Sequence, residues 1–212
     1  MMQPEYSFSS EKIEAACQTL GHDLGWRLLT CPSRNIEAAE IALITINPGG
    51  GEFEAPQWSV EAGSAYEIES WKGHLPGEEN LQRQVRRMFE VMGAPPSEIL
   101  SGYLVPFRSR RWQNLPRKAD SIRYGVGIWR EILKKAKVRT VIAFGKDIAP
   151  QMVSLLDAGS LTEHPTYWGE QKISRYRFGD GGNLLVLPHL STFKLFSDRK
   201  YENAFLAALG AI

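Results

Sequence analysis

Short apolar runs that alternate with helical patterns constrain the fold of this chain more than any other feature of its sequence. The runs occupy residues 41–46, 103–107, 140–144 and 184–187. Apolar stripes at helical spacing lie between them, at residues 78–91, 120–136 and 148–156. A nearly continuous apolar run such as 41–46 (IALITI) is typical of a strand that is covered on both faces. The alternation predicts a three-layer α/β/α sandwich with a central, mainly parallel four-stranded sheet.

The remaining segments complete this outline. A first helix is expected to be capped by Ser10 and to end at Gly21, and residues 199–209 are predicted to form a closing helix. Residues 173–178 should form a hairpin with the run at 184–187. The segment 50–77 has no clear periodicity and exceeds the usual loop length, as functional or disordered loops often do. The 212 residues, 43% of them hydrophobic, favour a single domain spanning 1–212.

Composition excludes several classes of protein. No signal peptide is recognised, and no apolar run approaches the roughly 20 residues that a membrane span needs, so we expect a cytoplasmic protein without a membrane partner. Cys17 and Cys31 form no CxxC pair and belong to no Cys/His cluster. We therefore expect no metal, no cofactor and no disulfide framework.

Basic residues are unevenly distributed although the chain is nearly neutral, with 25 Lys and Arg against 24 Asp and Glu. Residues 108–118 hold basic side chains and no acidic one, and a second basic cluster occupies residues 134–139. The first cluster also holds Trp112 and Asn114, the mixture expected of a surface that binds phosphates and contacts bases. The alternative is a solvated loop, which is what charge runs usually form.

The sequence INPGGG, residues 46–51, follows the first predicted strand. Asn47 would project a short polar side chain from the strand end, Pro48 would restrict the turn, and the glycines would let backbone N–H groups approach a ligand. The alternative is a tight glycine-rich turn in which Asn47 satisfies local backbone groups. Neither GxGxxG nor GxxxxGK[ST] is present, so the common nucleotide-binding loops find no support.

The sequence LPHLST, residues 187–192, follows the last predicted strand. Taken alone, His189 is more often a structural histidine than a catalyst. The carboxyl ends of parallel strands meet at one edge of the sheet, where ligands of such folds bind. The turns that carry Asn47 and His189 are therefore expected to converge there from distant parts of the chain.

This pair of motifs resembles motifs A and B of the uracil-DNA glycosylase superfamily, in particular the branches whose first motif contains NPG. VIAFGKDIA, residues 141–149, is similar to the third-strand segment of that family, and YLVPF, residues 103–107, to its second-strand segment. The resemblance spans approximately residues 41–192. The four cysteines of the iron–sulfur branches are absent, so those branches are excluded.

The resemblance implies hydrolysis of the N-glycosidic bond of a flipped uracil, or of another deaminated or damaged base, in DNA. Asn47 would position the attacking water, and His189 would hydrogen-bond the O2 atom of the departing base. The base would be bound by residues near the two turns: Pro48, Gly49, Trp58 and Tyr103. Trp58 would stack on the flipped base. Its alternative role is to pack against the sheet.

The resemblance also implies DNA as the partner of a monomeric protein. Ser191 and Thr192 would contact phosphates, while Phe193 or Lys194 would enter the groove when the nucleotide is extruded. Phe193 could equally belong to the core. The other DNA-binding candidates are basic: Arg108, Arg110, Arg111 and Lys146.

Two departures from the family pattern leave other functions open. Tyr103 stands where the family often has an Asn that reads the edge of uracil, and Leu190 replaces the proline between the His and Ser of motif B. A second hypothesis is therefore a catalytically inactive or divergent member that binds nucleic acid, a free nucleobase or a nucleotide. A third, an unrelated α/β hydrolase or transferase, is disfavoured because no G-x-S-x-G sequence is present.

Overall fold

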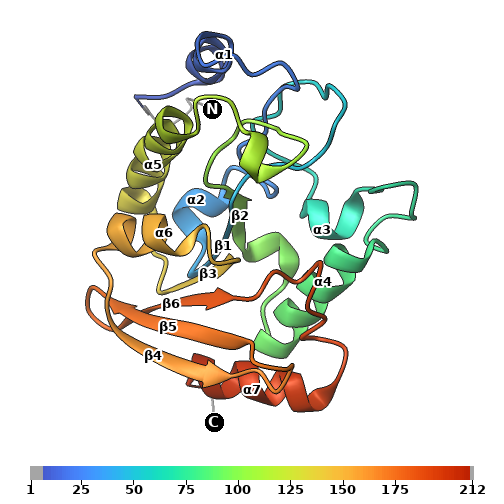
Figure 1. Ribbon diagram of the computed structural model, residues 1–212, viewed down its shortest axis with the longest axis vertical. Helices are drawn as coiled ribbons and strands as arrows, with labels where there is room; N and C mark the ends of the chain where they lie inside the picture. Colours follow the sequence, from blue (N-terminus) through green and yellow to red (C-terminus); the bar gives the residue numbers. More distant parts are fainter. Residues whose placement is uncertain (1–6, 211–212) are drawn as a thin grey trace.

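The computed structural model describes residues 7–210, which form an α/β fold around one mixed six-stranded sheet (Figure 1). The strands are β1 (Ile41–Thr45), β2 (Leu100–Tyr103), β3 (Thr140–Phe144), β4 (Gly159–Pro165), β5 (Lys172–Phe178) and β6 (Gly182–Leu187). Their order in the sheet is β2-β1-β3-β6-β5-β4. The first four strands in this order are parallel, β5 is antiparallel to β6, and β4 is antiparallel to β5.

The prediction of a four-stranded sheet was wrong, because the antiparallel strands β5 and β4 extend the four parallel strands to a sheet of six. The predicted hairpin between β5 and β6 is confirmed. β4 has no sequence signal of a buried strand, since six of its seven residues are exposed at the edge of the sheet. The register between β4 and β5 also shifts between Gly159 and Thr162.

Helices cover both faces of this sheet (Figure 1). They are α1 (Ser10–Thr19), α2 (Asn35–Ala38), α3 (Ala65–Ile68), α4 (Asn80–Met92), α5 (Lys118–Lys135), α6 (Ala149–Leu156) and α7 (Arg199–Leu209), with 3₁₀ turns η1 (Pro96–Glu98) and η2 (Trp112–Asn114). The cap of α1 is Ser9 rather than the predicted Ser10. Among residues 7–210, no helix is long and apolar enough to cross a membrane.

Alternate residues of each central strand face two separate hydrophobic cores. Ala42 and Ile44 of β1 belong to the core beneath α5, α6 and α1, which we call the α5-side core. Leu43 belongs to the core beneath α4 and α7, the α4-side core. Neighbouring strands follow the same rule. In β3, Ala143 belongs to the α5-side core and Phe144 to the α4-side core. A strand buried on both faces explains why its sequence is apolar without alternation.

β2 begins and ends earlier than the predicted run 103–107, because it spans Leu100–Tyr103. Pairing with β1 nevertheless continues beyond it. The backbone N–H groups of Leu104 and Val105 donate to the carbonyl oxygens of Thr45 (2.7 Å) and Ile46 (2.9 Å). This pairing leads the basic segment that follows β2 alongside the INPGGG turn.

His22 provides a test of the α5-side packing. Its ring is buried and stacks on Phe107 with centroids 4.2 Å apart, and its Nε2 atom lies 2.9 Å from Ser121 Oγ. Burial lowers the pKa of His22 to about 4. The unfolded chain therefore binds a proton below pH 6.5 that the folded protein excludes, so this residue alone should reduce the free energy of unfolding by at most about 3 kcal/mol as the pH falls from 6.5 to 4.

Urea unfolding of the wild type and of His22→Gln between pH 7 and 4.5 measures this contribution. We expect stability to depend less on pH in the variant, by the equivalent of up to one proton. Identical pH slopes for the two proteins would contradict the assignment of a neutral, buried imidazole.

Candidate functional site

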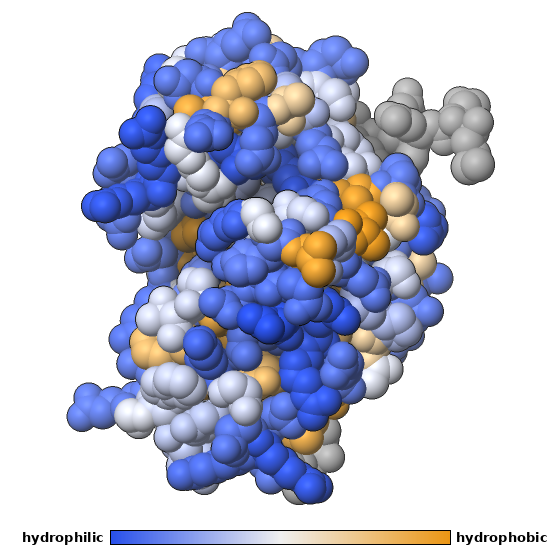
Figure 2. All heavy atoms as spheres, turned by 90° about the vertical axis from the view of Figure 1, so that its right-hand side faces the viewer, coloured by the Kyte–Doolittle hydropathy of each residue, from blue (hydrophilic) through white to orange (hydrophobic). Residues whose placement is uncertain are grey.

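The turns after β1 and β6 lie at the same edge of the sheet. Ile44 pairs with Ala143, and Ala143 pairs with Val186, so the three strands are in register at their carboxyl ends. Asn47 lies three residues after Ile44, and His189 lies three residues after Val186. Only β3 separates β1 from β6, so the two strand ends are about 10 Å apart. The face on the right of Figure 1, shown in Figure 2, is hollowed and has apolar side chains at the bottom of the recess.

The amide of Asn47 is held in one orientation by its neighbours. Its Nδ2 atom donates to the carbonyl oxygens of Pro48 (3.1 Å) and Phe107 (3.2 Å) and lies 2.9 Å from Ser109 Oγ. Carbonyl oxygens only accept, so these contacts determine which end of the amide is nitrogen. Within residues 7–210, no hydrogen bond engages Oδ1. The half-buried Asn47 therefore has an acceptor available for a ligand or a water molecule.

The imidazole of His189 is likewise held in place, through one of its two nitrogens. Ser191 donates its backbone N–H to Nδ1 (3.3 Å), and Ser191 Oγ lies 2.8 Å from the same atom. A backbone N–H can only donate, so Nδ1 accepts, and a neutral ring then carries its proton on Nε2. Burial lowers the pKa of His189, which favours the neutral ring at pH 7. No described residue bonds to Nε2, so the side chain has an N–H donor available.

Two arginines pack against residues 49–51, which we call the glycine turn. Arg108 is buried, and its guanidinium donates to the Gly49 carbonyl oxygen and to the Glu54 carboxylate. Gly50 has φ of 133°, and a Cβ there would lie 2.6 Å from Arg108 Nη1. Arg110 packs against Gly51 from the exposed side, and the hydrogen bond from Arg108 to Gly49 helps to hold the shape of the turn. The prediction of Arg108 as a phosphate contact disagrees with this geometry, because its guanidinium is already engaged inside the protein.

A buried polar cluster beside Tyr103 had no signal in the sequence. Arg27 is 6% exposed and donates to both carboxylate oxygens of Glu69, at 2.9 and 2.5 Å. Trp71 Nε1 donates to the same carboxylate (2.9 Å). Burial opposes the ionisation of Glu69, but the hydrogen bonds from Arg27 hold its pKa below the usual range. The pair anchors the long segment 50–77 to the segment around Arg27, whose backbone hydrogen-bonds to Tyr103 and Pro106.

Tyr103 and Tyr66 lie next to this ion pair. Tyr103 is at the end of β2. Burial raises the pKa of its phenol, and the positive charges of Arg27 and Arg108 offset only part of this rise. Tyr66 is fully buried in the α4-side core beside Thr45, and burial raises the pKa of its phenol as well. Two phenols therefore stand near the ends of β1 and β2.

Glu69→Ala should destabilise the protein because it leaves the Arg27 guanidinium buried without its carboxylate. Breaking a buried ion pair costs several kcal/mol, but the side chain of Glu69 is 25% exposed and water can reach part of the gap, so we expect a loss of about 2 kcal/mol. Thermal or urea unfolding measures this loss. Lys172, whose partner Glu163 is exposed, offers a control: Glu163→Ala should change stability by less than about 0.5 kcal/mol. Equal effects would contradict a structural role for the Arg27–Glu69 pair.

The other predicted residues are distributed between surface and core. Trp58 packs against the α5-side core with its indole stacked on Phe8, at 5.5 Å between centroids, which matches the packing alternative rather than a free stacking surface. Phe193 packs half-buried against the α4-side core. Pro48 is buried and Gly49 is exposed. The remaining predicted DNA contacts are all exposed: Arg110, Arg111, Lys146, Ser191, Thr192 and Lys194.

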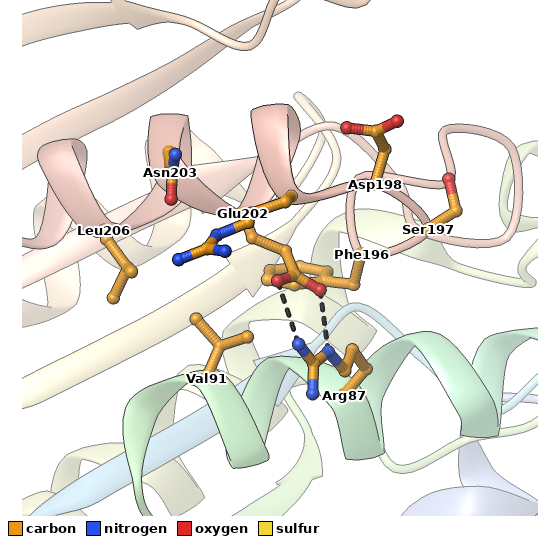
Figure 3. A pocket seen from close by; sticks show the side chains of 9 residues that line it. Arg87, Val91, Phe196, Ser197, Asp198, Glu202, Asn203 and Leu206 are labelled. Carbon is orange, nitrogen blue, oxygen red and sulfur yellow. Dashed lines mark hydrogen bonds and ion pairs between the residues drawn. The ribbon is translucent and has the colours of Figure 1, made fainter.

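The pocket of about 550 Å³ between α4 and α7 is separate from this edge (Figure 3). Arg87 of α4 and Glu202 of α7 join across it through hydrogen bonds of 2.7 and 3.0 Å. A second pocket, of about 460 Å³, lies at the glycine turn and is lined by Gly50, Gly51, Glu52, Glu54 and Arg110. The second one adjoins the candidate site, whereas the first is lined by an ion pair between helices.

Neither the sequence comparisons nor, among residues 7–210, a cluster of metal-ligating side chains indicates a function. Among residues 7–210, no group of three or more His, Cys, Asp or Glu side chains is arranged to hold a metal ion. No protein-family model matches the chain, and no curated protein matches it in sequence. Function is therefore inferred from the residues at the sheet edge.

Proposed function

We propose that this protein is a DNA N-glycosylase that hydrolyses the bond between deoxyribose and a flipped, deaminated or damaged base. The observation that carries the proposal is the complementary pair at one sheet edge. Asn47 has an oriented amide with an available acceptor, and His189 has an oriented neutral imidazole with an available donor. Hydrolysis of a glycosidic bond needs an acceptor for the attacking water and a donor for the departing base.

In the proposed reaction, Asn47 Oδ1 accepts a hydrogen bond from a water molecule and aligns it with C1′ of the flipped nucleotide. The water oxygen forms a bond to C1′ as the C1′–N bond breaks, and the bonding electrons leave with the base. His189 Nε2–H donates to a base oxygen on which negative charge accumulates. The proton released by the water passes to solvent or to the departing base, because a neutral amide is too weak a base to retain it.

The fold supports this proposal. The parallel strands β2-β1-β3-β6, with helices on both faces, are compatible with the three-layer sandwich predicted from the alternation of apolar runs, and with the resemblance to uracil-DNA glycosylases. The β5 and β4 hairpin is an extension of that sheet. Exposed Arg110, Arg111 and Lys146 lie on loops after strands of the same sheet and are suited to binding backbone phosphates.

A base-release assay tests the proposal. Duplex and single-stranded DNA carrying uracil, hypoxanthine, xanthine or a mismatched uracil would be incubated with the protein, and free base and abasic sites would be quantified. We expect release of at least one of these bases without added metal. Absence of release from every substrate, at protein in excess over DNA, would refute hydrolysis.

Binding without cleavage is the second candidate, and Tyr103 favours it. A phenol under the charge of Arg27 and Arg108 stands where the family often has an amide that reads uracil, so recognition of the base would differ from the family pattern. A binding protein would hold DNA with an affinity that falls steeply as salt increases, yet release no base. Measuring affinity and base release on the same substrates separates the two functions.

A further inference from the structure

The second basic cluster of the sequence, residues 134–139, lies at the opposite edge of the sheet from the candidate site. It connects α5 to the start of β3, whose carboxyl end lies between those of β1 and β6. The Arg139 carbonyl oxygen accepts a hydrogen bond from Asn183 N (2.8 Å), and Asn183 pairs with Arg177 of β5. In Figure 1 the starts of β3 and β6 lie on the left of the sheet, away from the hollowed right-hand face. We call this end of the sheet the amino edge.

Several cations at the amino edge lack a carboxylate partner. Within residues 7–210, the following form no ion pair: Lys137, Arg139, Arg175 and Arg177. Arg175 Nε donates to Asn183 Oδ1 (2.9 Å), and Arg177 Nη1 donates to the Gly181 carbonyl oxygen (3.4 Å), so both acceptors are uncharged. The two arginines are two residues apart in β5, which places their side chains on one face, about 7 Å apart at Cα. Burial and the charge of Arg177 lower the pKa of Arg175. The pair therefore lacks a negative group that would neutralise it.

Structural roles explain only some of these cations. The last turn of α5 is basic, and cations at this position stabilise a helix through its dipole. Arg175 lies near the C-cap of α7, since a Cβ on Gly210 would be 3.2 Å from Arg175 Nη1, and the same dipole argument applies there. Arg139 and Arg177 belong to no helix, and both are exposed. Their charges are therefore available to a ligand.

The chemistry of the amino edge fits an extended polyanion. Two exposed carboxylates, Glu40 and Asp180, adjoin it, but the cations outnumber them. None of the exposed large hydrophobic residues of the described chain falls within 134–139 or 175–183, whereas protein interfaces usually centre on apolar or aromatic side chains. Neither pocket described above is lined by these segments, so a small ligand would not be enclosed there. Spaced cations on an open surface suit the regular phosphates of duplex DNA.

We infer that the amino edge is a second DNA-binding surface, which holds a duplex through its phosphates while the candidate site faces another segment. Contacts to phosphates carry no base information, so this surface binds without regard to sequence. One protein molecule can then hold two segments at once. The inference goes beyond the proposed function, because it requires no cleavage at the candidate site.

The test counts the duplexes that one protein molecule binds at low salt. Sedimentation with an excess of an undamaged duplex of about 12 base pairs, slightly more than one helical turn, gives the number of DNA and protein chains in the complex. We expect two duplexes on the wild type and one on Arg139→Gln/Arg177→Gln. Arg123→Gln/Lys172→Gln is the matched control and should bind two, because it removes two exposed cations that already have carboxylate partners. With Arg139→Gln or Arg177→Gln alone, the log–log salt slope of amino-edge binding should fall by about one.

The outcomes separate this inference from the proposed function. Equal numbers of duplexes on the wild type and on Arg139→Gln/Arg177→Gln, or the same loss in the control variant, would overturn the inference. One duplex on the wild type and none on Arg139→Gln/Arg177→Gln would support the amino edge and contradict DNA binding at the candidate site. If polyglutamate displaces the amino-edge duplex more effectively than unlabelled duplex does, the ligand is an acidic polypeptide and the DNA assignment fails. Base release is measured separately, so its absence bears only on the catalytic proposal.

Discussion

Substituting His189 with alanine is expected to lower kcat for base release by about 10²–10³-fold, the usual effect of removing one donor that stabilises developing negative charge. The neutral ring has its proton on Nε2, because the Ser191 backbone N–H occupies Nδ1. The donor acts on charge that forms only as the glycosidic bond breaks, so KM should change little. Single-turnover release from the best substrate of the wild type measures the effect.

The companion variant Asn47→Ala tests the other half of the site. It removes the oriented Oδ1 that is proposed to align the water, and we expect a loss of about 10²-fold. Lys194→Ala, at an exposed position on the same edge, is the control and should alter affinity for DNA more than kcat. Wild-type rates in both His189→Ala and Asn47→Ala would show that neither side chain takes part in the reaction.

Replacing Gly125 with alanine is expected to destabilise the protein by about 3 kcal/mol or more, at or above the upper end of the usual cost of overpacking a core. Gly125 is buried in α5, and a Cβ there would lie 2.0 Å from the Leu104 carbonyl oxygen and 3.1 Å from Val105 Cα. These are backbone atoms of the segment that pairs with the end of β1, so they cannot swing aside as a flexible side chain would. The helix would have to move away from the sheet.

Gly127, two residues further along the same helix, supplies the matched control. A Cβ there would have no neighbouring atom within 4 Å, so Gly127→Ala should be neutral or stabilising by up to about 1 kcal/mol, as expected for glycine in a helix interior. Urea unfolding of both variants compares the two sites directly. A similar change in stability at both positions would contradict the close contact between α5 and residues 104–105.

Elements with strong local signals could be predicted from the sequence. Helix α4 begins at a capping box formed by Glu79 and Gln82 and ends at Gly93, close to the predicted 78–91. Strand β3 matches residues 140–144, and α7 matches 199–209. In each case the apolar period, the cap or the terminating glycine lies within the element or directly next to it.

Elements shaped by distant parts of the chain could not be predicted in the same way. β2 reads LSGY, which has little apolar character, because the segment around Leu28 crosses directly over it: a Cβ on Gly102 would lie 2.5 Å from the Leu28 carbonyl oxygen. β4 is an exposed edge strand, so burial imposes no pattern on it. Such close approaches and edge pairings leave no local period in the sequence.

The same distinction applies to the candidate site. Asn47 and His189 could be found because each directly follows an apolar strand, and strand direction brings such positions to one edge. The Arg27–Glu69 pair could not be found, since its partners are distant in sequence and an ion pair has no local pattern. Arg108 was misassigned for a related reason: the number of charges in a segment does not show that one guanidinium turns inward to Gly49 and Glu54.

The central claim is that Asn47 and His189 act on the same flipped nucleotide. A crystal structure with a duplex that contains the best substrate base on a 2′-fluoro sugar, which slows cleavage, tests this most directly. We predict an extruded base between the two turns, with His189 Nε2 within hydrogen-bond distance of a base oxygen and Asn47 Oδ1 bonded to a water that faces C1′. A base that remains stacked in the duplex, or that is bound away from either side chain, would contradict the claim.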